Sequence, residues 1–161
     1  MSLAVSGTFY FLSDDYFIDF PDRQLMRDKE PVDGQKHGRP CFYAFEDPKT
    51  GLLWMIPFSS KVEKYRAHEQ KKIAKYGRCD TILFGYILGH EKAFLIQNMC
   101  PATDKYLVNQ YIDSKNNVVV RVDGAFEEKL TKTARQVLSK VRKGIKLVFP
   151  DVLAIERSLL L

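Results

Sequence analysis

The segment WMIPFSSKVEKY, residues 54–65, passes from apolar residues through a proline and two serines into a basic, polar run. Residues 52–57 are typical of a β-strand, whereas residues 61–76 have the periodicity of a helix. A strand is therefore expected to end, and a helix to begin, at Ser59 and Ser60. The question is why two hydroxyls and Lys61 stand at this junction.

Other strand-like segments surround the junction, each rich in β-branched or aromatic residues and bounded by turn residues. They span residues 8–12, 40–46, 81–87, 92–96 and 117–122, and residues 22–38 are expected to form a polar loop. Turns at residues 47–51 (DPKTG) and 88–91 (LGHE) predict two antiparallel hairpins. Helical periodicity recurs over 124–143 and 151–161, with Gly77 and Gly144 as helix stops. The pattern predicts an α+β fold, a small curled antiparallel β-sheet or barrel with helices packed outside.

Length and composition fit one domain over residues 1–161. The chain is 45% hydrophobic, enough to bury a core, and it has no repeat or linker. No apolar run approaches the roughly 20 residues of a membrane span, and the start has no signal-peptide pattern, so a soluble, cytoplasmic protein is expected. Cys41, Cys79 and Cys100 form no CxxC pair and are interpreted as reduced thiols rather than zinc ligands.

Positive charge is concentrated in two segments. The net charge is +5, yet residues 61–78 hold seven Lys/Arg against two acids, and residues 129–146 hold seven with no acid. Two basic segments on an otherwise acidic chain indicate a polyanionic partner, and RNA fits. The candidate RNA-binding residues are Tyr10, Lys36, Lys64, Tyr65, Arg66, Lys129, Lys132, Arg135, Lys140 and Lys143.

Ser60 and Glu63 match the S-x-x-E capping box, which predicts a helix N-terminus and typically contributes about 1 kcal/mol. The same N-terminus presents unpaired N–H groups and a partial positive charge that favour a phosphate. Capping leaves Ser59 unexplained, and it leaves Lys61 at the positive end of the helix dipole. An RNA phosphate site at the junction explains both.

Basic residues also precede the strand at residues 40–46. Lys36, His37 and Arg39 lie at its start, and in an antiparallel hairpin the start of one strand lies beside the end of the other. This cluster should therefore be close to the two serines. Pro40 restricts Arg39 to an extended backbone, and a guanidinium is suited to binding phosphate. His37 is a candidate for proton transfer or a solvent-exposed residue of a polar loop.

Several motifs together resemble one protein family. PFSSK at 57–61, KHGRPCFYAF at 36–45, FYFLSDDYF at 9–17, NMCP at 98–101 and the segment 134–146 resemble the toxins of type III toxin-antitoxin systems, the ToxN/AbiQ group and most closely its CptN branch. The resemblance implies an endoribonuclease with a MazF/Kid-like curled barrel, acting in phage abortive infection. It also implies inhibition by a repeat-derived pseudoknot RNA antitoxin, which the toxin cuts from a precursor, in a closed protein–RNA assembly.

The chemistry of metal-free RNA cleavage assigns roles to these residues. The substrate's own 2′-hydroxyl attacks the adjacent phosphate, so the protein supplies positioning, charge stabilisation and proton transfer. Lys61 and Arg39 are assigned to charge stabilisation, Ser59 and Ser60 to holding the phosphate, and His37 or a lysine to proton transfer. The acids near the N-terminus are interpreted as surface residues of a short helix, so neither a metal site nor another cofactor is expected.

Two other functions fit the same residues. A non-catalytic RNA-binding domain would use the basic segments and exposed aromatic residues to hold RNA by charge and stacking. An adaptor would dock an acidic protein on its basic helices and would not bind nucleic acid at physiological salt. A cleavage assay in EDTA separates the nuclease from both.

Overall fold

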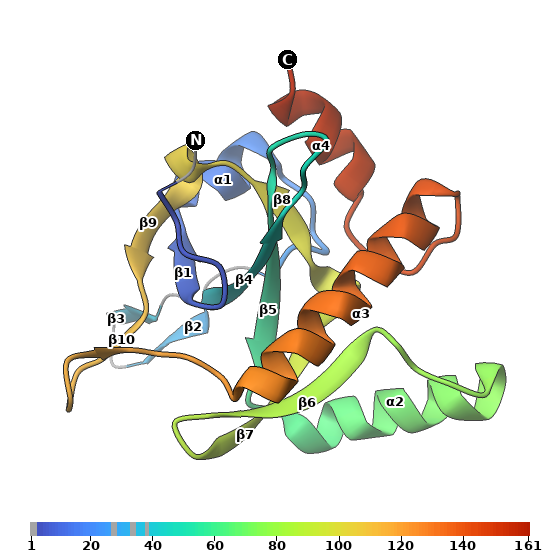
Figure 1. The fold of residues 1–161 in the computed structure, drawn as a ribbon, viewed down its shortest axis with the longest axis horizontal. Coiled ribbons are helices and arrows are strands. Elements are labelled where there is room, and N and C mark those ends of the chain that lie inside the picture. The colour runs from blue at the N-terminus through green and yellow to red at the C-terminus, as the bar shows by residue number, and fades with distance from the viewer. Residues whose placement is uncertain (1–2, 27–28, 33–34, 38) are drawn as a thin grey trace.

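The computed structural model describes residues 3–26, 29–32, 35–37 and 39–161, with side chains described over 3–26 and 39–161 (Figure 1). The helices are α1 (Asp14–Asp19), α2 (Val62–Tyr76), α3 (Gly124–Arg142) and α4 (Val152–Leu159), with short 3-10 turns η1 (Ile96–Asn98) and η2 (Asp104–Tyr106). The strands are β1 (Phe9–Leu12), β2 (Lys29–Val32), β3 (Gln35–His37), β4 (Pro40–Glu46), β5 (Leu53–Ser59), β6 (Ile82–Ile87), β7 (His90–Leu95), β8 (Cys100–Ala102), β9 (Leu107–Gln110), β10 (Ile112–Asp113) and β11 (Val118–Val119).

The main sheet is antiparallel and has the order β6-β7-β5-β4-β1-β9. Its central strand, β5, pairs with β4 along one edge and with two strands along the other. The first half of β5 pairs with β8, where Met55 lies opposite Cys100, and its end pairs with β7, where Phe58 lies opposite Phe94. The turn η1 joins β7 to β8 beside β5, so the sheet bends at this strand.

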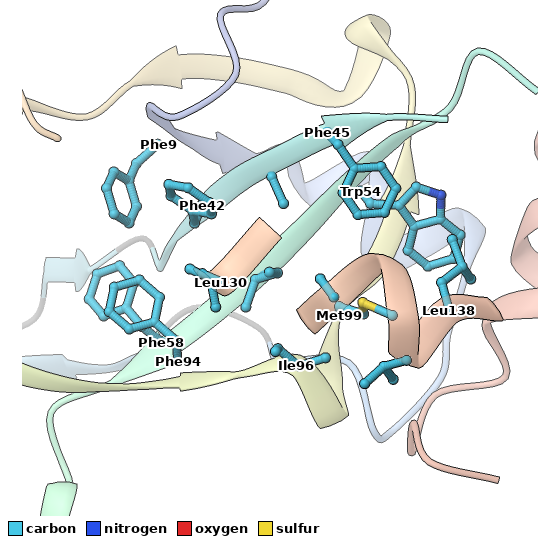
Figure 2. Packing of buried hydrophobic residues seen from close by; sticks show 14 of the residues in the cluster. Phe9, Phe42, Phe45, Trp54, Phe58, Phe94, Ile96, Met99, Leu130 and Leu138 are labelled. Atoms are coloured by element: carbon cyan, nitrogen blue, oxygen red, sulfur yellow. The ribbon is translucent and has the colours of Figure 1, made fainter. Parts of the chain in front are cut away.

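Alternating side chains along β4 and β5 bury both faces of the sheet, as the period of two in a strand requires. One face, with Phe42, Trp54 and Phe58, packs against the apolar side of α3, for example Leu130. Figure 2 shows this core, in which Phe9, Phe42, Phe58 and Phe94 form one cluster of rings. The opposite face packs against α1 and α4, and α2 covers the β6–β7 hairpin through Tyr65. Both termini lie at the end of the sheet where α1 and α4 gather (Figure 1).

The two predicted hairpins, β4–β5 and β6–β7, are confirmed. The first turns through Gly51 and the second through Leu88 and Gly89, and all three have positive φ. The predicted helix stops are confirmed as well. Gly77 ends α2 in the left-handed conformation, and Gly144 follows α3 with a φ of 96°.

Other expectations need correction. The sheet is curled but open, because β6 and β9 are its edges and no pairing between described residues joins them into a barrel. The segment expected as a polar loop contains the β2–β3 hairpin. The strand expected at residues 117–122 is limited to β11, which pairs with β10 at Val118 and Val119, and Asn117 belongs to the preceding turn with a positive φ of 53°. The sequence analysis did not anticipate β8, β9 and β10.

Candidate functional site

The junction between β5 and α2 is held by Ser59 rather than Ser60. Ser59 is the last residue of β5 and is only 6% exposed, and its Oγ accepts a hydrogen bond from the backbone N–H of Lys61 at 3.1 Å. Lys61 is the N-cap of α2, and its side chain makes no capping hydrogen bond. The predicted capping box of Ser60 and Glu63 is therefore wrong. The helix begins at Val62, so Lys61 takes the capping position and Ser60 lies one residue before it.

Arg39 lies beside the junction, as the hairpin argument predicted. The pairing of Cys41 with Pro57 brings the residues before β4 alongside the end of β5. The Arg39 guanidinium donates a hydrogen bond to the carbonyl of Phe58 at 3.0 Å. One contact with the backbone thus places this cation next to Ser59.

Lys92 also lies at this junction, although the sequence analysis did not predict it. Ser59 pairs with Ala93 across β5 and β7, so the next residue along, Ser60, lies level with Lys92. The Lys92 ammonium donates to Ser60 Oγ at 2.8 Å. A hydroxyl that accepts from an ammonium directs its own O–H elsewhere, and Ser60 is exposed. Ser60 is thereby oriented as a donor toward solvent.

We call Arg39, Ser59, Ser60, Lys61 and Lys92 the junction cluster. Its members come from the start of β4, the end of β5, the start of α2 and the middle of β7. The cluster combines two hydroxyls, one guanidinium and two ammonium groups. Such a set can hold an oxyanion, and phosphate is the anion that a guanidinium and hydroxyls suit best. The side chains of Lys36 and His37, also predicted here, lie outside the side chains that the structure describes.

Three of the candidate RNA-binding residues are engaged within the protein. Arg66 forms an ion pair with Glu91 and its guanidinium lies 4.3 Å from the centroid of the Phe84 ring. Tyr65 is 9% exposed because it packs between α2 and the β6–β7 hairpin. The Tyr10 hydroxyl accepts the backbone N–H of Val5 at 2.9 Å. The interpretation of Tyr65 as an exposed stacking residue is wrong, whereas Lys64 is exposed as expected.

The long helix α3 presents its cations to solvent. Its apolar side, with Leu130, Ala134 and Val137, is buried against the sheet, and Asp123 caps its start by accepting the N–H of Phe126 at 3.2 Å. The exposed cations on the other side, called here the α3 cations, are Lys129, Lys132, Arg135, Lys140 and Lys143. The guanidinium of Arg135 also lies over the Phe45 ring at 4.3 Å.

Comparisons with known proteins bear on the fold. No family model matches the sequence, and no curated protein matches it. Among solved structures, the chain is similar to AbiQ, a lactococcal anti-phage endoribonuclease belonging to the type III toxin-antitoxin system. The similarity covers 84% of this chain and 82% of AbiQ, with a TM-score of 0.58 and 16% sequence identity. The chain therefore shares the fold of AbiQ.

Two further searches concern the described part of the chain alone. Within it, no helix has the length and apolar character to cross a bilayer. The described His, Cys, Asp and Glu side chains include no group of three or more placed to hold a metal ion.

Proposed function

We propose that this protein is an endoribonuclease and the toxin of a type III toxin-antitoxin system. The observation that carries the proposal is the junction cluster, in which Ser60 is held by Lys92 and Ser59 lies beside Arg39. The shared fold with AbiQ supports it, since that protein is an endoribonuclease of such a system. Assignment to the CptN branch of the ToxN/AbiQ group is part of the proposal and rests on the sequence motifs.

The proposed reaction is a metal-independent transesterification. The 2′-hydroxyl of the substrate loses its proton and attacks the adjacent phosphorus; the bond to O2′ forms, the bond to O5′ breaks, and the departing 5′-oxygen gains a proton. The products are a 2′,3′-cyclic phosphate and a 5′-hydroxyl. In this scheme the Ser60 O–H donates to a non-bridging oxygen, while Lys92, Arg39 and Lys61 stabilise the charge that grows on the phosphorane. His37 or a lysine carries the proton.

The proposed partner is an RNA antitoxin built from pseudoknot repeats. In this proposal the toxin cuts the precursor, and the product stays bound with a terminal phosphate in the junction cluster and its backbone along the α3 cations. Repetition of this contact around several chains would give a closed protein–RNA assembly. Substrate and antitoxin would then compete, which a titration of a short substrate analogue against a fixed amount of antitoxin tests. Simultaneous binding without mutual loss of affinity would contradict occlusion of the active site.

Cleavage of RNA in EDTA, with analysis of the product ends, is the decisive experiment. We expect cyclic phosphate and 5′-hydroxyl ends, and a rate at least roughly a hundredfold lower in Lys92→Met, because a preorganised donor is lost. Lys105→Met is the matched control, since this exposed lysine lies in η2 and belongs neither to the junction cluster nor to the α3 cations. RNA that is bound but left uncut would overturn the proposal in favour of a binding domain.

A further inference from the structure

A pocket of about 500 Å³ lies between α2, residues 23–26 and η1. Tyr65, His68 and Lys72 line it from α2 at a spacing of three and four residues, which places them on one face of the helix. Phe149 and Gln97 line it from the other side. Its volume lies in the range of small-molecule sites, and it contains no member of the junction cluster.

The charge in this pocket is positive and unbalanced. Arg23, Lys71 and Lys72 line it, and the described side chains that line it include no carboxylate. Lys72 is half-buried, and its ammonium donates to two neutral acceptors, Thr81 Oγ1 at 2.8 Å and Gln97 Oε1 at 2.6 Å. Burial lowers the pKa of Lys72. A partly buried ammonium with neutral partners is stabilised by an anion bound beside it.

Aromatic side chains line the pocket beside these cations. The rings of Tyr65 and His68 meet edge to face, with centroids 5.3 Å apart. Phe149 is 46% exposed, and its backbone N–H donates to the Gln97 carbonyl at 2.8 Å, which fixes the ring near the Lys72 ammonium at 5.5 Å. Exposed aromatic surface next to cations matches a ligand that has both a planar ring and an anionic group.

We propose that this pocket binds one unpaired nucleotide of an RNA chain, with its phosphate at Arg23, Lys71 and Lys72 and its base against Phe149 and His68. The proposal rests on the proposed function and adds a subsite to it. His68 lies six residues after Val62, the first residue of α2, so this part of the pocket lies about 9 Å along the helix from the junction cluster at 1.5 Å per residue. A strand with one phosphate in the junction cluster could reach the pocket within a few nucleotides.

Binding of the four nucleoside 5′-monophosphates to the full chain tests the pocket directly, with inorganic phosphate and adenosine as separate probes. Arg23→Met and Lys71→Met remove exposed cations that line the pocket, and Lys75→Met is the control on the same helix outside the pocket. We expect saturable binding of at least one monophosphate, tighter than either separate probe. The affinity should fall about tenfold in Arg23→Met and Lys71→Met and stay unchanged in Lys75→Met.

Three results would overturn the proposal: no saturable binding, equal affinity in the pocket variants and the control, or a monophosphate that binds no tighter than inorganic phosphate. Lys72→Met is measured together with an unfolding curve, because Lys72 also links α2 to Thr81 and Gln97. If it remains folded, it should lose affinity at least as strongly as Lys71→Met, and full affinity in a folded Lys72→Met would also overturn the proposal.

Cleavage kinetics separate this proposal from the proposed function. Pocket variants should raise KM for RNA more than they lower kcat, whereas Ser60→Ala should lower kcat more than it raises KM. If the protein cleaves RNA but binds no monophosphate, the proposal of a nucleotide pocket is overturned and the proposed function is not. Monophosphate binding by a protein that neither binds nor cuts RNA would overturn the assignment to an RNA chain and show a free-nucleotide site.

Discussion

The two serines of the junction should separate stability from catalysis. Ser59→Ala removes a hydroxyl that is 6% exposed and accepts the Lys61 N–H at 3.1 Å, so the turn into α2 loses a fixed acceptor. The loss of such a hydrogen bond at a helix start costs about 1 kcal/mol. For a chain of 161 residues this lowers Tm by roughly 2–4 °C. Ser60 is exposed, and its bond to Lys92 lies at the surface, so Ser60→Ala should change stability by less than about 0.5 kcal/mol.

Activity should show the reverse order. In the proposed reaction the Ser60 hydroxyl, which accepts from Lys92, donates its O–H to the phosphate, so Ser60→Ala should lower the cleavage rate by roughly a hundredfold. Ser59→Ala should lower it by less than about tenfold, through the position of Ser60 and Lys61 alone. Thermal and urea unfolding are measured beside cleavage of one defined RNA, with the exposed Ser114→Ala as control. A Ser60→Ala protein that unfolds as early as Ser59→Ala, or that cleaves at the wild-type rate, would refute this reasoning.

Three further predictions concern the scaffold and the RNA surface. Gly85→Ala would place a Cβ 2.4 Å from the Phe126 ring and should destabilise by about 1–3 kcal/mol in urea unfolding, with part of the loss recovered by Phe126→Leu. The pKa of Asp47 is lowered, since the Lys49 N–H and Arg142 outweigh the burial that raises it; its stabilisation is present above the unfolded pKa near 4 and lost as pH falls through the folded value. Arg142→Met should therefore reduce the loss of stability between pH 7 and pH 3. Neutralising three of the α3 cations should reduce the slope of log K against log salt for antitoxin binding by roughly 0.7 to 0.9 per lost phosphate contact, and an unchanged slope would show a merely solvated face.

The parts of the fold that sequence predicts are those fixed by local chemistry. The turn DPKTG sets the β4–β5 hairpin through a proline and a glycine with positive φ, and Gly77 ends α2 for the same conformational reason. The short strands β8 and β9 were not predicted because their pairing with β5 and β1 depends on partners about 45 and 100 residues away in sequence. In strands of three or four residues, the alternation of apolar and polar residues is too short to show which face is buried.

The candidate site divides in the same way. Arg39 could be predicted because its neighbour in space follows from one hairpin, whereas Lys92 depends on the register between β5 and β7, which no local signal sets. The available clue was a lysine at the last polar position of the strand HEKAFL, directly before its apolar residues. The capping box failed because S-x-x-E requires the helix to start directly after Ser60, whereas the Lys61 N–H donates to Ser59 Oγ and α2 starts one residue later, at Val62.

The junction explains how one short segment can hold the fold and present the donors of the proposed site together. Ser59, Arg39 and the end of β5 are tied by hydrogen bonds to backbone atoms, which depend on the path of the chain rather than on a ligand. Ser60 is tied instead to a side chain, Lys92, and remains exposed. A site built on strand ends keeps its donors fixed before a phosphate arrives, and donors that need no reorganisation are the ones that stabilise a developing charge most effectively. Substitutions at backbone-tied positions should thus change stability first, and substitutions at Ser60 and Lys92 should change the reaction first.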